Sequence, residues 1–116
     1  MTLHDDRIYL RQMLSHAQTA LEIASDKDRS ALETDPMFRY ALLHLISILG
    51  EAATRVSDAF RLEHPLIAWR NIIGMRNMVI HGYDVVDLDV LWKTVEEDVP
   101  DLIKKLQCIL NKIISD

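Results

Sequence analysis

The side chains best suited to chemistry lie near position 80, where Arg76, His81 and Tyr83 form the pattern Arg-x4-His-x-Tyr. Arg76 interrupts an otherwise apolar row of a predicted helix, and a guanidinium there is costly unless it meets an anion or a wet cleft. We expect His81 in the last turn of that helix, where the negative helix end favours imidazolium and places the histidine to titrate near neutral pH. Together these groups could perform acid–base chemistry on an anionic ligand.

Each of these residues also has an ordinary structural explanation. Arg76 could lie along the surface and pair with an acid such as Glu51. His81 could simply end a helix, and Tyr83 could pack against the fold with its hydroxyl in water. The complete pattern, however, is expected by chance only about 0.01 times in a chain with this content of Arg, His and Tyr. The combination therefore carries more weight than any member alone.

The first half of the chain predicts two long helices. Apolar residues at steps of three and four predict an amphipathic helix over about residues 5–25, followed by a polar loop over residues 26–30. Asp35 can cap the next helix while Pro36 takes its first position, and the pattern continues to about Arg61. The middle of this second helix is apolar on more than one face, which is typical of a helix buried on two sides. A short chain buries both sides most easily as a homodimer.

The second half predicts two further helices. The pair His64-Pro65 marks the start of the third, and Gly82 is placed to end it as a C-terminal cap. A polar stretch follows, in which Asp87 or Asp89 caps the last helix. That helix keeps one apolar phase across Pro100, so we expect it to be continuous and kinked there. The predicted fold class is all-α, an antiparallel bundle of four long helices.

The third predicted helix has an unusual polar stripe. At about 100° per residue, Arg70, Gly74, Asn77 and His81 fall on one line along the helix surface. Asn77 is also adjacent to Arg76, which makes it a candidate secondary donor. The stripe predicts one helix face that concentrates polar groups beside the Arg-x4-His pattern.

Length and composition describe one small globular domain over residues 1–116, with 49% hydrophobic and 27% charged residues. The net charge of −5 argues against a protein that coats DNA or RNA in bulk, yet residues 39–83 carry five Arg against three acids and could bind an anion locally. The chain shows no apolar run of membrane-spanning length, no signal-peptide pattern and one cysteine, so we expect a cytoplasmic protein. The histidine spacing does not fit a helical zinc site, and no phosphate-cradling glycine loop is present. We therefore expect no metal and no cofactor.

The pattern lies within a longer stretch that resembles a known family. Residues 76–83 read Arg-Asn-Met-Val-Ile-His-Gly-Tyr and follow Trp-Arg-Asn-Ile-Ile-Gly-Met at residues 69–75. Further likeness lies in Gly50-Glu51-Ala52, in Leu91-Trp92 and in Asp98-Val99-Pro100. With these features the chain resembles the HEPN superfamily, and specifically its HepT-like branch of small bacterial and archaeal toxins.

The resemblance implies a metal-independent endoribonuclease toxin that acts on RNA as a homodimer, with an active site assembled at the dimer interface from the motifs of both subunits. It assigns cleavage to Arg76 and His81. It also implies a partner, a minimal nucleotidyltransferase antitoxin of the MntA type, which silences the toxin by adenylylating Tyr83. Secondary candidates for the site are Arg70, Asn77 and Glu51.

The chemistry of these residues is compatible with that implication. RNA cleavage without a metal needs a base for the ribose 2′-hydroxyl, an acid for the leaving 5′-oxygen and cationic donors for the phosphoryl oxygens. His81 can serve as base or acid, and the fork of Arg76 can bind two oxygens. On an ideal helix their spacing of five puts them about 140° apart, which loosely favours a site completed by a second chain. An adenylyl group on Tyr83 would add bulk and negative charge where the RNA phosphate must lie.

Two other interpretations stay open on the sequence. The chain could be a non-catalytic helical binding subunit of a nucleotidyltransferase complex, in which case replacing His81 by alanine would change nothing. It could also be a dimer that binds a free nucleotide through Arg70 and Arg76, which a thermal shift with nucleotides would reveal. The intact pattern favours the nuclease, because docking alone does not need a titratable histidine beside an arginine.

Overall fold

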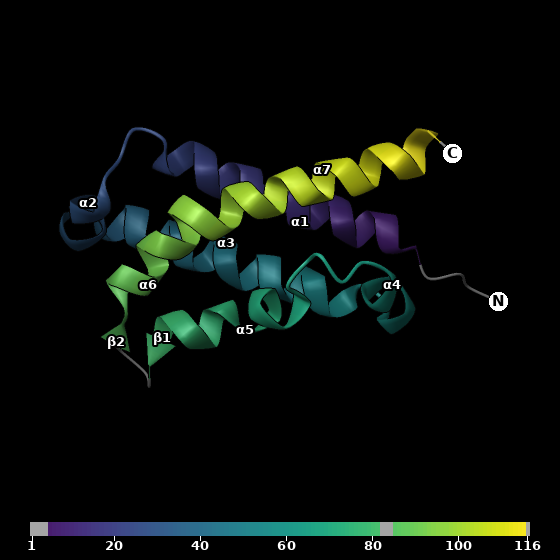
Figure 1. Ribbon diagram of the computed structural model, residues 1–116. Coiled ribbons are helices and arrows are strands. Elements are labelled where there is room, and N and C mark those ends of the chain that lie inside the picture. Colours follow the sequence, from purple (N-terminus) through teal and green to yellow (C-terminus); the bar gives the residue numbers. More distant parts are fainter. Residues whose placement is uncertain (1–4, 82–84, 116) are drawn as a thin grey trace.

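The computed structural model describes residues 5–81 and 85–115, and this part of the chain is predominantly helical (Figure 1). No helix within it is both long and apolar enough to cross a membrane. In chain order, the elements are α1 (Asp6–Ala24), α2 (Arg29–Thr34), α3 (Pro36–Arg55), α4 (Asp58–Glu63), α5 (Trp69–Val79), β1 (Ile80–His81), β2 (Val85–Val86), α6 (Leu88–Lys93), the π-helical turn η1 (Thr94–Asp98) and α7 (Val99–Ser115).

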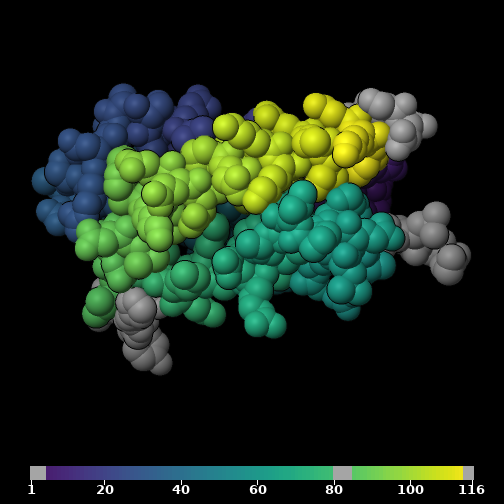
Figure 2. Space-filling view, in the orientation of Figure 1, coloured from purple at the N-terminus to yellow at the C-terminus, as the bar shows by residue number. Residues whose placement is uncertain are grey.

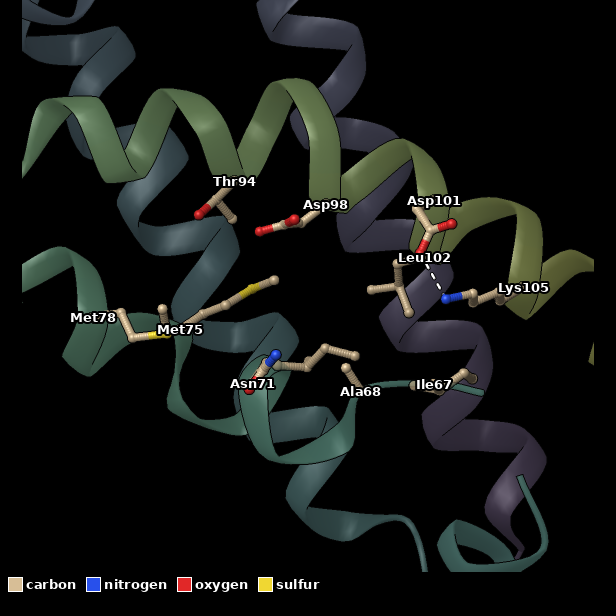
Figure 3. Close-up of a pocket in the computed structure, with 11 residues that line it drawn as sticks. Ile67, Ala68, Asn71, Met75, Met78, Thr94, Asp98, Asp101, Leu102 and Lys105 are labelled. Atoms are coloured by element: carbon tan, nitrogen blue, oxygen red, sulfur yellow. Dashed lines mark ion pairs between the residues drawn. The ribbon is translucent and has the colours of Figure 1, made fainter. Parts of the chain in front are cut away.

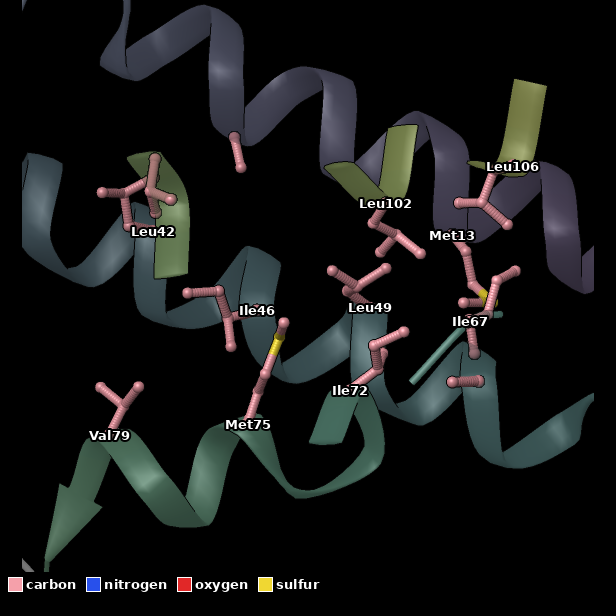
Figure 4. Close-up of a cluster of buried hydrophobic side chains, with 14 of the residues drawn as sticks. Met13, Leu42, Ile46, Leu49, Ile67, Ile72, Met75, Val79, Leu102 and Leu106 are labelled. Carbon is pink, nitrogen blue, oxygen red and sulfur yellow. The ribbon is translucent and has the colours of Figure 1, made fainter. Parts of the chain in front are cut away.

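The longer segments lie side by side and reverse direction from one to the next (Figure 1). Helix α1 packs against both α3 and α7, and α3 also packs against α5. In Figure 2 the continuous segment α6–η1–α7 lies next to α5 and α4 on the face toward the viewer. The buried side chains meet between these helices (Figure 4), and they include Met13, Leu42, Ile46, Leu49, Ile72, Met75, Val79, Leu102 and Leu106.

Two of the predicted helix starts are confirmed in detail. Asp35 accepts a hydrogen bond from the backbone N–H of Phe38 at 3.2 Å, and Pro36 occupies the first position of α3. Asp87 caps α6 by accepting from the N–H of Val90 at 3.1 Å. The predicted first helix is also confirmed as α1. The polar loop expected over residues 26–30 is shorter, because α2 already begins at Arg29.

The predicted end of the second helix is wrong, because α3 stops at Arg55 and not near Arg61. Val56 takes an extended conformation, and Ser57 then caps the separate short helix α4. The break between α3 and α4 is stabilised by a contact with α1. The N–H and hydroxyl of Ser57 both donate to the carboxylate of Asp6, at 2.8 and 2.7 Å. A contact between residues so far apart in sequence leaves no local signal in the hydrophobic pattern.

The predicted start of the third helix is also wrong, because α5 begins at Trp69 and not at His64. A turn over residues 65–67 connects α4 to α5. The indole N–H of Trp69 donates to the carbonyl of His64 at 3.0 Å, and the N–H of Ile67 donates to the same carbonyl at 3.3 Å. These bonds satisfy the carbonyl that a helix starting at His64 would use for its own first turn.

The last helical segment runs through Pro100 without a break, and its irregularity is a π-helical turn just before the proline. In this turn the N–H of Val99 bonds to the carbonyl of Thr94, five residues back. A proline has no N–H to donate, and its ring crowds the carbonyl four residues back. The wider turn before Pro100 accommodates both effects.

Two glycines provide a matched test of helix packing. A Cβ on Gly50 of α3 would lie 3.0 Å from the carbonyl oxygen of Ile72 in α5, whereas a Cβ on Gly74 would have nothing within 4 Å. We expect Gly50→Ala to lower the free energy of unfolding by about 1 kcal/mol or more, since overpacking exceeds the gain in helix propensity. Gly74→Ala is expected to raise it by about 0.5–1 kcal/mol. Urea denaturation of both variants measures this, and equal shifts would contradict the close α3–α5 packing.

A second prediction concerns pH. Burial, and then the charge of His44 on α3, lower the pKa of His16 on α1 below its usual value of 6.5. The unfolded chain therefore takes up this proton more readily than the folded one, so the free energy of unfolding should fall as the pH drops below 6.5. Urea unfolding at about pH 7.5 and about pH 5.5 should show a smaller difference for His16→Gln than for the wild type. An equal difference would show that His16 is not responsible.

Candidate active site

Helix α5 carries the candidate residues and is strongly two-sided. Trp69, Ile72, Met75 and Val79 are buried. The residues that face outward are polar or flexible, and they are Arg70, Asn71, Arg76, Asn77 and Met78. The helix contains two arginines and no acidic residue, which sets it apart from a chain whose net charge is −5. The core therefore fixes one face of α5 and leaves the basic face to solvent.

The predicted position of His81 in the last turn of a helix is wrong. Helix α5 ends at Val79, and Ile80 and His81 form strand β1, with His81 paired to Val85 of the antiparallel strand β2. The N–H of Asp87 donates to the carbonyl of Val79 at 2.7 Å and closes this small ladder. His81 therefore lies two residues beyond the end of α5, and its backbone does not continue the helical line that contains Asn77.

Three parts of the sequence prediction lie outside the described residues. These are Gly82 as a helix cap, Tyr83 as a modification site and the side chain of His81. The backbone of His81 is nevertheless placed immediately beyond the last turn of α5, which contains Arg76. The two candidate positions therefore lie near each other along the chain, one in the last turn of α5 and the other just beyond it.

Among the described residues, Arg76 finds no acidic partner for the ion pair that would give it a purely structural role. Its side chain is exposed, and no hydrogen bond or ion pair joins it to any other residue that the structure describes. Glu51, the expected acid partner, instead has a carboxylate oxygen 3.6 Å from a guanidinium nitrogen of Arg55. Glu51 thus does not join Arg76 in a site within this chain. The guanidinium of Arg76 remains open to an external anion.

Arg70 and Asn77 are brought together along an open groove between α4 and α5. We call it the α4–α5 groove, and its lining includes Arg61, Trp69, Arg70, Ile73, Gly74 and Asn77. Arg61 is held in an ion pair with Asp58 on the same short helix. Arg70 is exposed and has no such pair among the described residues. The groove was not predicted, because its second wall, α4, was expected to be part of a longer helix.

A separate pocket of about 130 Å³ lies on the other flank of α5, against η1 and α7 (Figure 3). Asp98 and Asp101 enter it from above, facing Asn71. Lys105 is paired with Asp101 at 2.7 Å, so the pocket keeps a net negative charge. This pocket disfavours a phosphate. In the described residues, no three His, Cys, Asp or Glu side chains are grouped closely enough to hold a metal ion.

Comparison with known proteins places this arrangement in a family. A family model for HepT-like ribonucleases (Ribonuclease HepT-like) matches residues 13–109. The chain is 33% identical over 109 residues to "Putative RNase MJ1380" of Methanocaldococcus jannaschii, covering 94% of this chain and 100% of that protein. It is 41% identical over 73 residues to "Probable ribonuclease HepT" of Thermococcus cleftensis, covering 63% of this chain and 66% of that protein. No solved structure matches the chain significantly. The family model covers most of the chain and the first relative all of its own length, so the chain belongs to the HepT-like ribonuclease family.

Proposed function

We propose that this protein is a metal-independent endoribonuclease and the toxin of a toxin–antitoxin pair, working as a homodimer of antiparallel helical bundles. The single observation that carries the proposal is Arg76. It is an exposed guanidinium with no ion pair in the described chain, and it lies at the end of α5 that leads into His81. Membership of the HepT-like ribonuclease family supports RNA as the substrate.

In the proposed reaction the two residues have distinct roles. Arg76 holds the scissile phosphate through two oxygens and offsets the charge that grows on them. His81 takes the proton of the ribose 2′-hydroxyl or donates one to the leaving 5′-oxygen. One histidine cannot do both in the same step. A second subunit related by a two-fold axis would supply the other proton-transfer group, which supports the proposed homodimer.

The proposed control mechanism acts on the same end of α5. A minimal nucleotidyltransferase antitoxin transfers an adenylyl group from a nucleoside triphosphate to the hydroxyl of Tyr83, releasing pyrophosphate. Tyr83 is two positions from His81 in the sequence. The added phosphodiester repels an RNA phosphate, and the adenosine blocks its approach.

The experiment that tests the nuclease is cleavage of total cellular RNA by the purified chain in excess chelator. The intact mass is measured first, so that an adenylylated sample is not mistaken for an inactive one. Cleavage to internal fragments in chelator, without release of single nucleotides from the ends, supports an endonuclease that needs no metal. If unmodified protein cuts none of several RNA classes, the nuclease proposal fails and the binding-subunit interpretation takes its place.

A further inference from the structure

The α4–α5 groove has the charge and the position expected of a path for the substrate. Its cation with no ion pair in the described part of the chain is Arg70, whereas its carboxylate, on Asp58, is already neutralised by Arg61. Asn77, also in the groove, has an exposed side-chain amide that can donate hydrogen bonds. The groove therefore presents a positive charge and neutral donors, which suit the phosphates and sugar hydroxyls of RNA.

The proposed catalytic arginine lies beside the groove, since Arg76 directly precedes Asn77, which lines it. Trp69, Ile73 and Arg76 are spaced by four and three residues, so they form one row on the surface of α5. The first two line the groove, and Arg76 continues the row toward β1. Arg70 and Arg76 are separated by about 9 Å along the helix axis, at about 1.5 Å per residue. A strand of RNA that extends past Asn77 would thus come near Arg76, the adjacent residue, at the end of α5 that leads into His81.

Gly74 leaves the room that such a strand needs. It lies between Arg70 and Asn77 in the groove, and a Cβ built on it meets no atom within 4 Å. The backbone of α5 is therefore approachable at this point. Trp69 cannot stack on a base there, because it is only 8% exposed and its indole N–H is bonded to His64. The contacts available are to the RNA backbone, and they predict weak dependence on base sequence.

We infer that the α4–α5 groove binds the sugar–phosphate backbone of one RNA strand and guides it to Arg76, with Arg70 contacting a phosphate and Gly74 providing clearance. This inference rests on the proposed ribonuclease function. Arg70 and Asn77 are positioning residues here, since they hold the strand and take no part in proton transfer.

The binding test uses His81→Ala as the background, so that the RNA stays intact, and a fluorescein-labelled oligouridylate as the probe. Fluorescence anisotropy at several salt concentrations gives the Kd and its salt dependence. Arg70→Ala is expected to raise Kd about threefold to tenfold and to reduce the slope of log K against log salt by about 0.7. Arg11→Ala is the matched control, because it removes an exposed arginine from α1, whose main packing partners are α3 and α7. Equal effects of Arg70→Ala and Arg11→Ala would overturn the inference.

A second variant tests the clearance at Gly74. Gly74→Leu projects a larger side chain from a position where a Cβ meets no atom within 4 Å, and circular dichroism and thermal melting check that the fold is retained. We expect it to weaken RNA binding at least tenfold, whereas Gly74→Ala has a small effect.

Light scattering on the same samples gives the oligomeric state. The oligomeric state matters because Leu62, which lines the groove, is a large apolar side chain that is 81% exposed. A contact between two copies of this chain could cover it. A changed oligomeric state with unchanged RNA affinity would assign the groove to that contact and overturn the inference.

Steady-state cleavage separates this inference from the proposed function. In the active protein, Arg70→Ala should raise KM more than it lowers kcat, whereas Arg76→Ala should chiefly lower kcat. If Arg70→Ala lowers kcat alone, the groove is not a binding path although the nuclease stands. If neither the wild type nor His81→Ala cuts RNA, the proposed ribonuclease function is wrong. The anisotropy result then shows only whether the groove binds RNA.

Discussion

Replacing His81 by alanine is expected to lower the rate of RNA cleavage by about 10²–10⁴-fold, the usual contribution of a positioned acid–base group. The loss should appear in kcat, because the proposed role of the imidazole is to transfer protons that move only during the reaction. The measurement is the initial rate of cleavage of a labelled RNA in excess chelator. Circular dichroism and thermal melting of the variant check that it folds like the wild type.

Two substitutions of Arg76, by alanine and by lysine, test the phosphate-binding part of the same proposed reaction. Its side chain is exposed and has no ion pair in the described chain, so Arg76→Ala should leave the free energy of unfolding within about 0.5 kcal/mol of wild type. Arg76→Lys keeps the positive charge but loses the fork that binds two oxygens, and it should recover only part of the rate. Arg11→Ala controls for the loss of a surface charge. Full cleavage activity of His81→Ala would show that His81 is not the proton-transfer group of the reaction.

Replacing Tyr83 by phenylalanine is expected to leave cleavage intact and to abolish silencing by the antitoxin. The phenol oxygen is the proposed acceptor of the adenylyl group, and phenylalanine removes only that oxygen. Wild-type protein incubated with its cognate nucleotidyltransferase, Mg²⁺ and ATP should gain adenylyl mass and lose most of its ribonuclease activity. Tyr83→Phe under the same conditions should gain no mass and keep cutting.

The matched control for this second result is Tyr40, an exposed tyrosine on α3. Tyr40→Phe should still be adenylylated and silenced, which shows that the enzyme is not modifying exposed tyrosines in general. In cells, co-expression of the antitoxin should rescue growth from the wild type and from Tyr40→Phe but not from Tyr83→Phe. Rescue of Tyr83→Phe, with an adenylyl group found on another residue, would contradict the assignment.

Helix starts could be predicted from the sequence where one capping side chain decides them. Asp35 before Pro36 and Asp87 before α6 are local signals, and both carboxylates accept the expected backbone N–H. Predictions failed where the deciding contact is distant. Asp6 holds Ser57 and so ends α3 six residues early, while the apolar pattern continues past the break. The serine three positions before Phe60 was a usable local hint of a new helix start.

The candidate site was only partly predictable for a similar reason. The spacing of Arg76 and His81 identified both positions, but the helix was expected to continue through His81. The β-branched residues Ile80, just before His81, and Val85 and Val86, after the motif, favour the strand pairing that is observed. The α4–α5 groove could not be predicted at all, because it depends on the separate helix α4.

The two-residue ladder after α5 has a thermodynamic consequence for catalysis. Fixing the backbone of one residue costs about 1–2 kcal/mol of conformational entropy. For the backbone of Ile80 and His81 this entropy is lost during folding and not during RNA binding. The pairing with β2 and the hydrogen bond from Asp87 to Val79 already hold these two residues in the folded chain. Less of the free energy of RNA binding is then consumed in ordering the histidine, and more of it can lower the barrier. Loosening this ladder would therefore slow the enzyme without altering any group that touches the substrate.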